Sequence, residues 1–208
     1  MSNEVKTKEK VDMDPKYLVK LTVTLFVTCV IVAGLLGFVN KLTLPNITAA
    51  NERKTAKAIQ EVLPEMEGSP TVMELTDEMT AAAAGAGATV TEAYEAQAGG
   101  SVIGHALKIV ASGSQGNIVM MVGLDAEGAV TGVSIVSNSE TSGIGSKVMN
   151  NEPLNSGTGV LDQFIGKSAA DGELTVGKNV DAISGATVSS KGVTTGVNAA
   201  LAVAGLLG

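Results

Sequence analysis

The hydropathy pattern is dominated near its start by one apolar run at residues 21–39, LTVTLFVTCVIVAGLLGFV, which contains no charged side chain. At about 1.5 Å per residue, a helix of this length comes close to spanning a hydrocarbon core of roughly 30 Å. A cleavable signal peptide is the alternative, but its apolar region usually runs about 7–15 residues. We therefore predict a retained transmembrane helix at 21–39, preceded by a polar tail at 1–20.

The segment that follows the apolar run has a helical period. Apolar side chains recur at helical spacing in ANERKTAKAIQEVL at 50–63, and NIT at 46–48 offers a helix cap. Residues 65–88 are acidic and then rich in alanine and glycine, which is typical of a flexible linker. We expect an amphipathic stalk helix and a linker over residues 40–88.

Four later segments are predicted as strands that short turns join in pairs, and the first of them, at 89–97, alternates with the period of two that strands have. Gly99 and Gly100 form one turn, and DAEG at 125–128 forms the other, so two hairpins are predicted. The strand segments are TVTEAYEAQ at 89–97, SVIGHALKIVAS at 101–112, NIVMMVGLD at 117–125 and AVTGVSIVSN at 129–138.

A sheet with hydrophobic faces needs cover, and two segments can supply it as helices. One is the short segment 161–165, and the other is the C-terminal VTTGVNAALAVAGLL at 193–207. The predicted class is α+β: one transmembrane helix, then a small domain at 89–208 in which helices cover an antiparallel sheet.

Charge is distributed unevenly along the chain. Nine of the 14 basic residues lie at or before Lys57, whereas residues 58–208 hold five basic and 16 acidic residues, a formal net charge of −11. So acidic a domain repels phosphate backbones, which argues against nucleic acid as a partner. Basic residues flank the apolar run on both sides, so the positive-inside rule favours a cytoplasmic N-terminus only weakly.

Ordinary active-site chemistry is scarce. The only histidine, His105, lies in a strand pattern, and one histidine with one cysteine cannot form a zinc or iron–sulfur ligand set. Gly166-Lys167-Ser168 has the end of a phosphate-binding loop, but the glycine required at 161 is Leu161. With five aromatic residues in all, the chain has few rings to stack on a freely bound planar ligand.

Two segments combine glycine with hydroxyl groups at the ends of predicted elements. SNSETSGIGSKV at 137–148 directly follows a strand, and DAISGATVSSKGV at 181–193 directly precedes a helix. Backbone amides at such positions are free to meet an anion. By itself, Ser-Gly-Ala-Thr before a helix is also a common capping arrangement, so the motif alone leaves both interpretations open.

The second segment resembles the flavin-attachment motif of the FMN-binding domain family, in which the threonine of Ser/Thr-Gly-Ala-Thr is joined to FMN through a phosphoester. The first, ETSGIG at 140–145, resembles that family's upstream Glu-Thr-Pro-Gly-Leu-Gly motif. The order of the motifs, the two hairpins and the single anchor are similar to the G subunits of Rnf complexes, and the similarity covers nearly the whole chain. Rnf complexes are ion-translocating ferredoxin:NAD⁺ oxidoreductases.

The resemblance implies that Thr187 carries covalent FMN, at the start of a helix that begins near Val188. A hydroxyl flanked by small residues is open to a separate flavin transferase. No metal site is expected. The other residues that the resemblance places in the cofactor site are Ser184, Gly185, Ala186, Ser189 and Ser190 near Thr187, and Glu140, Thr141, Gly143 and Gly145 in the upstream loop. Lys191 is a further possible donor to the phosphate.

The function implied is that of a membrane-anchored electron carrier with no substrate-level active site of its own. Its partners would be the other membrane, iron–sulfur and flavin subunits of an Rnf complex. It would be single-pass in the cell (inner) membrane, with the C-terminal domain extracytoplasmic. The alternatives are the FMN-carrying C subunit of a sodium-translocating NADH:quinone reductase, and a non-redox membrane-anchored assembly module.

Two positions depart from the upstream motif of the family. Ser142 replaces its proline, and Asn138 replaces the histidine often found two residues before its glutamate. A loop without the proline is less constrained, and asparagine cannot take up a proton near the flavin ring as histidine can. These departures bear on tuning of the flavin rather than on its attachment.

Overall fold

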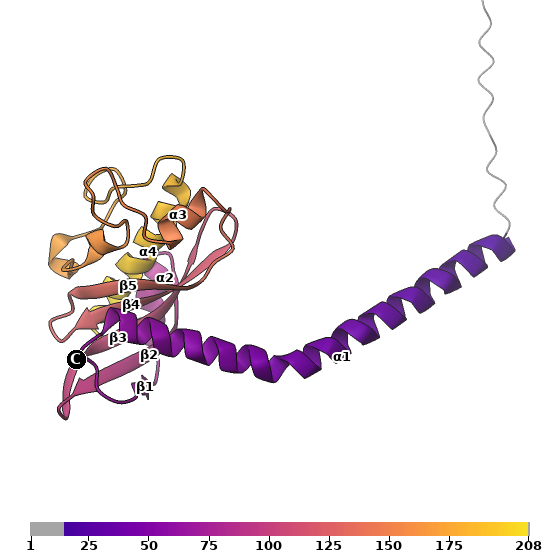
Figure 1. Ribbon diagram of the computed structural model, residues 1–208, viewed down its shortest axis with the longest axis horizontal. Helices are drawn as coiled ribbons and strands as arrows, with labels where there is room; N and C mark the ends of the chain where they lie inside the picture. The colour runs from indigo at the N-terminus through magenta and orange to yellow at the C-terminus, as the bar shows by residue number, and fades with distance from the viewer. Residues whose placement is uncertain (1–14, 208) are drawn as a thin grey trace, which may run out of the picture. The chain divides into compact units, whose positions relative to one another are not determined.

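The computed structural model describes residues 15–207 (Figure 1), and the chain divides into two compact units between Asn51 and Glu52. Helix α1 (Pro15–Val62) is 48 residues long and contains the whole apolar run at 21–39. By length and composition it is the one helix among the described residues that can cross a membrane. Most of the predicted N-terminal tail, residues 1–14, lies outside the described residues.

The predicted boundary between a transmembrane helix and a stalk helix does not appear in α1. The helix continues through Pro45, and Thr48 does not cap a new one. Instead, the Thr48 hydroxyl donates to the carbonyl of Leu44 at 3.1 Å, four residues back, as threonine does inside a helix. The predicted cap at 46–48 is therefore wrong.

The second unit is built on a five-stranded sheet in which every neighbouring pair is antiparallel. The predicted α+β class and both predicted hairpins are confirmed. Gly99 and Gly100 have φ of 58° and 81°, so the first hairpin turn needs backbone conformations that glycine adopts without strain. The strands, in the order of the sheet, are β1 (Thr71–Met73), β2 (Thr89–Ala98), β3 (Ser101–Ser112), β4 (Asn117–Asp125) and β5 (Val130–Ser137).

Helices cover both faces of this sheet. On one face α2 (Asp77–Gly85) and α4 (Thr187–Ala204) pack over a core that includes Leu107, Met120 and Val197. On the other face the last turns of α1 bury Ile59 and Val62 against Ala106 and Met121. The short helices are α3 (Gly145–Met149), η1 (Asp162–Phe164) and η2 (Ala169–Asp171).

Two glycines let α4 lie close to the sheet. A Cβ at Gly192 would stand 2.5 Å from the carbonyl oxygen of Ser112, and one at Gly196 would stand 2.6 Å from the side chain of Met120. Because Ser112 ends β3, this close approach brings the first turns of α4 beside the turn between β3 and β4.

The predicted flexible linker over 65–88 is wrong, because the structure has β1 and α2 there. Thr76 caps α2 by accepting a hydrogen bond from the Met79 amide at 3.2 Å, and Met79 and Ala83 are buried in the core. The alanine-rich run is thus a helix with one buried side, so elements of the sheet and core begin before residue 89.

His105 lies on β3 opposite Glu95 of β2. Burial lowers the pKa of His105, and the nearby Glu95 charge opposes that shift only in part. Within residues 15–207 no group of three or more His, Cys, Asp or Glu side chains is placed to hold a metal ion.

Candidate functional site

The two segments that combine glycine and hydroxyl groups meet at one small pocket of about 150 Å³. The loop after β5 forms one wall, the first turn of α4 forms another, and the turn between β3 and β4 contributes Ser114. The residues that line the pocket are Ser114, Glu140, Thr141, Ile144, Gly145, Gly185, Ala186, Thr187, Val188 and Ser189.

The entry into α4 presents Thr187 to solvent. Gly185 has φ +82°, a left-handed conformation that glycine adopts without strain, and the Ala186 amide donates to the Ile183 carbonyl at 2.9 Å to close the turn. Ala186 is 3% exposed and anchors the turn in the core, whereas Thr187, the first residue of the helix, is exposed. Within residues 15–207 the Thr187 hydroxyl has no hydrogen-bond partner, and no side chain caps the helix.

Glu140 ties three segments of the pocket together. Its Oε1 accepts hydrogen bonds from the amides of Ser114 at 2.8 Å and Gln115 at 3.2 Å. Its Oε2 accepts a hydrogen bond from the hydroxyl of Ser189, which is 1% exposed on the first turn of α4. The carboxylate therefore fixes the loop after β5 against both the β3–β4 turn and α4.

The backbone of Gly145 packs directly against the Glu140 carboxylate. A Cβ at this position would stand 2.4 Å from Glu140 Oε2 and 2.8 Å from Ser189 Oγ, so no larger residue fits without moving the bonded pair. The preceding loop is closed by the Gly143 amide, which donates to Ser146 Oγ at 2.8 Å. The pocket floor is thus defined by close packing and by hydrogen bonds within the domain.

Comparison with known proteins places this site in a family. Residues 113–202 match the FMN-binding domain. The chain is 35% identical to the G subunit of the Na⁺-translocating ferredoxin:NAD⁺ oxidoreductase complex of Acetobacterium woodii, over 96% of this chain and 97% of that one. The chain belongs to the G-subunit family of Rnf complexes.

Two further proteins are similar to this G-subunit family member. The G subunit of an ion-translocating oxidoreductase complex from Methanosarcina acetivorans is 28% identical over 90% of this chain and 95% of its own. The C subunit of the Na⁺-translocating NADH-quinone reductase from Parabacteroides distasonis, known from a crystal structure, is 17% identical, with a TM-score of 0.48 over 77% of this chain and 93% of that chain.

Most of the site residues predicted from the sequence of this G-subunit family member line the pocket. They are Glu140, Thr141, Gly145, Gly185, Ala186, Thr187 and Ser189, whereas Ser184, Gly143 and Ser190 are not in its lining. Ser190 is buried, and both its amide and its hydroxyl donate to the carbonyl of Ala186, at 2.9 and 3.1 Å. It therefore has no free donor for a ligand. Lys191 is exposed one position further along α4.

Three lining residues were not predicted as site residues. Ser114 lies in the β3–β4 turn, and its place in the site depends on the tertiary bond from its amide to Glu140, which no local pattern signals. Ile144 and Val188 lie inside the two motifs, and the structure leaves them 51% and 56% exposed. They put apolar surface at the rim of a pocket that is otherwise lined by small and polar residues.

Proposed function

We propose that this chain is a membrane-anchored electron-transfer subunit of an Rnf-type ion-translocating ferredoxin:NAD⁺ oxidoreductase complex, and that Thr187 carries FMN through a phosphoester. One observation carries the proposal. The exposed hydroxyl of Thr187, which has no partner among residues 15–207, stands at the first position of α4 on the pocket that Glu140 organises.

The start of α4 suits a phosphate. The first amides of an α-helix have no partner within the helix, and no side chain caps them here. A phosphodiester on Thr187 would place its negative charge beside these donors and the positive end of the helix dipole, which typically contributes about 0.3–1 kcal/mol. The first turn of α4 itself contains no acidic residue, and both oxygens of the nearby Glu140 carboxylate already accept hydrogen bonds from within the domain.

The size of the pocket favours a covalent bond over ordinary binding. At about 150 Å³ it is smaller than the roughly 300–1,000 Å³ of typical ligand sites, so it cannot enclose a flavin ring. A ring held by the Thr187 bond needs no enclosure, and Ile144 and Val188 offer it apolar surface at the rim. When bound, FMN would supply the electron-accepting and electron-donating chemistry.

The pocket is not built to act on a substrate. Glu140 is the one carboxylate or other ionisable group among the described residues that line it, and both of its oxygens already accept hydrogen bonds. The chain would therefore hold and orient the flavin, while the reactions of ferredoxin and NAD⁺ belong to other subunits of the assembled complex. Helix α1 would anchor the chain, with the domain on the extracytoplasmic side, and a separate flavin transferase would attach the cofactor.

Production of the whole chain with and without an active flavin transferase tests the attachment of FMN to Thr187. We expect one added FMN in the intact mass and a fluorescent band after denaturing electrophoresis, both dependent on the transferase. Thr187→Ala should lose both signals, and Ser184→Ala, which removes the neighbouring exposed hydroxyl, should keep them. No added mass in the presence of active transferase, or added mass that persists in Thr187→Ala, would refute the attachment.

A further inference from the structure

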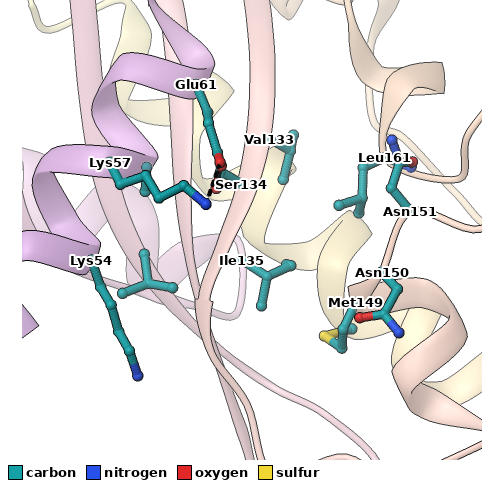
Figure 2. Close-up of a pocket in the computed structure, with 12 residues that line it drawn as sticks. Lys54, Lys57, Glu61, Val133, Ser134, Ile135, Met149, Asn150, Asn151 and Leu161 are labelled. Carbon is teal, nitrogen blue, oxygen red and sulfur yellow. Dashed lines mark hydrogen bonds and ion pairs between the residues drawn. The ribbon is translucent and has the colours of Figure 1, made fainter.

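A second and larger cavity, of about 440 Å³, lies along β5 (Figure 2) and shares no lining residue with the pocket at Thr187. Its floor is the central part of β5, Val133 to Val136. One bank is the end of α1, with Lys54, Lys57 and Glu61, and the other bank carries Met149 and Leu161 together with two asparagines. All of these residues belong to the unit that begins at Glu52.

The strand at the bottom of this groove is a sheet edge. β5 is last in the strand order and pairs with β4 on one side. On its other side, the backbone hydrogen bonds within residues 15–207 reach only Val130, which accepts from the Gly166 amide at 2.7 Å and donates to the Lys167 carbonyl at 2.8 Å. Residues 131–137 therefore continue as an edge with room beside it, and an open edge is a template for one more strand.

The two banks differ in chemistry. Lys54 has no ion pair within residues 15–207, and Lys57 pairs with Glu61 at 3.3 Å, in a contact whose lysine side chain is 80% exposed. Glu61 also accepts a hydrogen bond from Ser134 Oγ at 2.6 Å, which holds this bank on the strand. Lysines are notable here because residues 58–208 carry a formal net charge of −11.

The opposite bank is well fixed, and Asn150 and Asn151 lie on it beside Met149 and Leu161. Met149 and Leu161 are 8% and 4% exposed and belong to the core. Asn151 holds this bank in shape, since its side chain accepts from the Leu161 amide at 2.7 Å and donates to Asp162 at 2.9 Å. Successive side chains of an added strand would point alternately toward the lysines and toward this asparagine-bearing bank.

We infer that an extended segment of a neighbouring subunit adds to β5 as a sixth strand, and that carboxylate side chains at alternate positions of this segment face the lysines. The inference rests on the proposed membership of a multi-subunit complex. A second copy of this chain paired through β5 fits the lysines poorly, because VTGVSIVS at 130–137 contains no acidic residue. The charge of the lysine bank instead selects a carboxylate-bearing partner, by the complementarity that typically sets register at interfaces.

The test uses the assembled complex purified in mild detergent. A photoreactive amino acid at Asn150, exposed on the groove, should cross-link to one other subunit, and mass spectrometry should find the linked residue in an extended segment with acidic residues at alternate positions. The same probe at Val72, 71% exposed on the β1 edge of the sheet, is the matched control and should not give that product. A cross-link to a second copy of this chain, or none from Asn150 in an intact complex, would overturn the inference.

Charge reversal gives an independent result. The double variant Lys54→Glu with Lys57→Glu should reduce recovery of the cross-linked subunit by about tenfold, whereas Lys178→Glu, an exposed lysine elsewhere, should not. Unchanged recovery in the double variant would count against the groove. Covalent FMN on Thr187 should be the same in every variant, so a failure of docking is distinguishable from a failure of the proposed function by intact mass.

Discussion

Helices α2 and α4 lie on the same face of the sheet but begin in opposite ways. At α2, the side chain of Thr76 accepts the Met79 amide at 3.2 Å, and Asp77 and Glu78 put negative charge in the first turn. At α4, the capping position is a buried alanine, the first turn holds no acid, and the hydroxyl of Thr187 faces solvent. A side chain thus caps an N-terminal amide of α2, whereas no side chain caps the N-terminal amides of α4.

The difference follows from what each helix buries. α2 has nine residues, of which two are buried, so its stability depends on local terms such as its cap. α4 has 18 residues, of which 11 are buried, and its start is also held by the bond from Ser189 to Glu140. Tertiary packing can therefore fix the start of α4 without a cap, which supports the proposed use of Thr187 as an attachment site.

The largest expected effect is the loss of covalent FMN when the hydroxyl at the start of α4 is removed. Thr187→Val removes the hydroxyl at nearly constant shape, so covalent FMN should fall to zero. Because Thr187 makes no capping bond, the free energy of unfolding of the flavin-free chain should change by no more than about 0.5 kcal/mol. Intact mass and chemical denaturation measure the two quantities.

Thr187→Ser is the matched control for that variant, because it keeps a hydroxyl at the same position. It should retain covalent FMN. A Thr187→Val protein that unfolds much more easily than the parent would mean that the threonine is structural after all.

The next effect concerns the close packing of α4 on the sheet, which holds the start of this helix in place of a side-chain cap. Gly192→Ala on α4 places a methyl 2.5 Å from the Ser112 carbonyl, so it should destabilise the domain by about 1–3 kcal/mol despite the better helix propensity of alanine. Gly85→Ala at the end of α2 meets nothing within 4 Å and should be neutral or stabilising by up to about 1 kcal/mol. Equal effects in a denaturant titration would show that α4 has room to move away from the sheet.

A smaller effect is expected at the capped helix. Thr76→Ala removes the acceptor for the Met79 amide and should cost about 1 kcal/mol of unfolding free energy, within the range of about 0.5–2 kcal/mol for such caps. Covalent FMN on Thr187 should be unchanged, which is the reverse of the Thr187→Val result. Thermal unfolding and intact mass on the same samples provide the check, and a loss of FMN in Thr76→Ala would break the comparison.

The strands and the two helices α2 and α4 show how much of the fold the local sequence can predict. The strands at 89–138 were predictable because TVTEAYEAQ alternates with period two and glycine-containing turns at 99–100 and 125–128 mark two hairpins. α4 was predictable as an apolar C-terminal segment that can cover the sheet. α2 was missed because AAAAGAG has no apolar period and its composition is that of a linker, although alanine forms helices well. Its burial depends on the sheet, which no local window contains.

The candidate site shows the same limit. The two motifs were recognisable from their resemblance to a family, but Glu140 and Ser189 are 49 positions apart, and their bond was not predictable from either segment alone. Ser114 was missed for the same reason. The wrong cap at 46–48 has a different cause: a threonine hydroxyl that can start a helix can also bond to a carbonyl inside one, and Thr48 does the latter.

The smallest expected effect comes from giving α4 the first-turn charge that α2 already has. Val188 is 56% exposed, so Val188→Glu should place a carboxylate near the free amides of α4 and stabilise the flavin-free chain by about 0.3–1 kcal/mol relative to Val188→Gln. The same carboxylate should repel the incoming phosphate, so flavin attachment should be slower in Val188→Glu than in Val188→Gln. Timed mass spectra with a limiting amount of transferase measure the rates. If the two variants gain flavin equally fast, the open amides at the start of α4 do not contribute to phosphate binding, and its missing cap reflects packing alone.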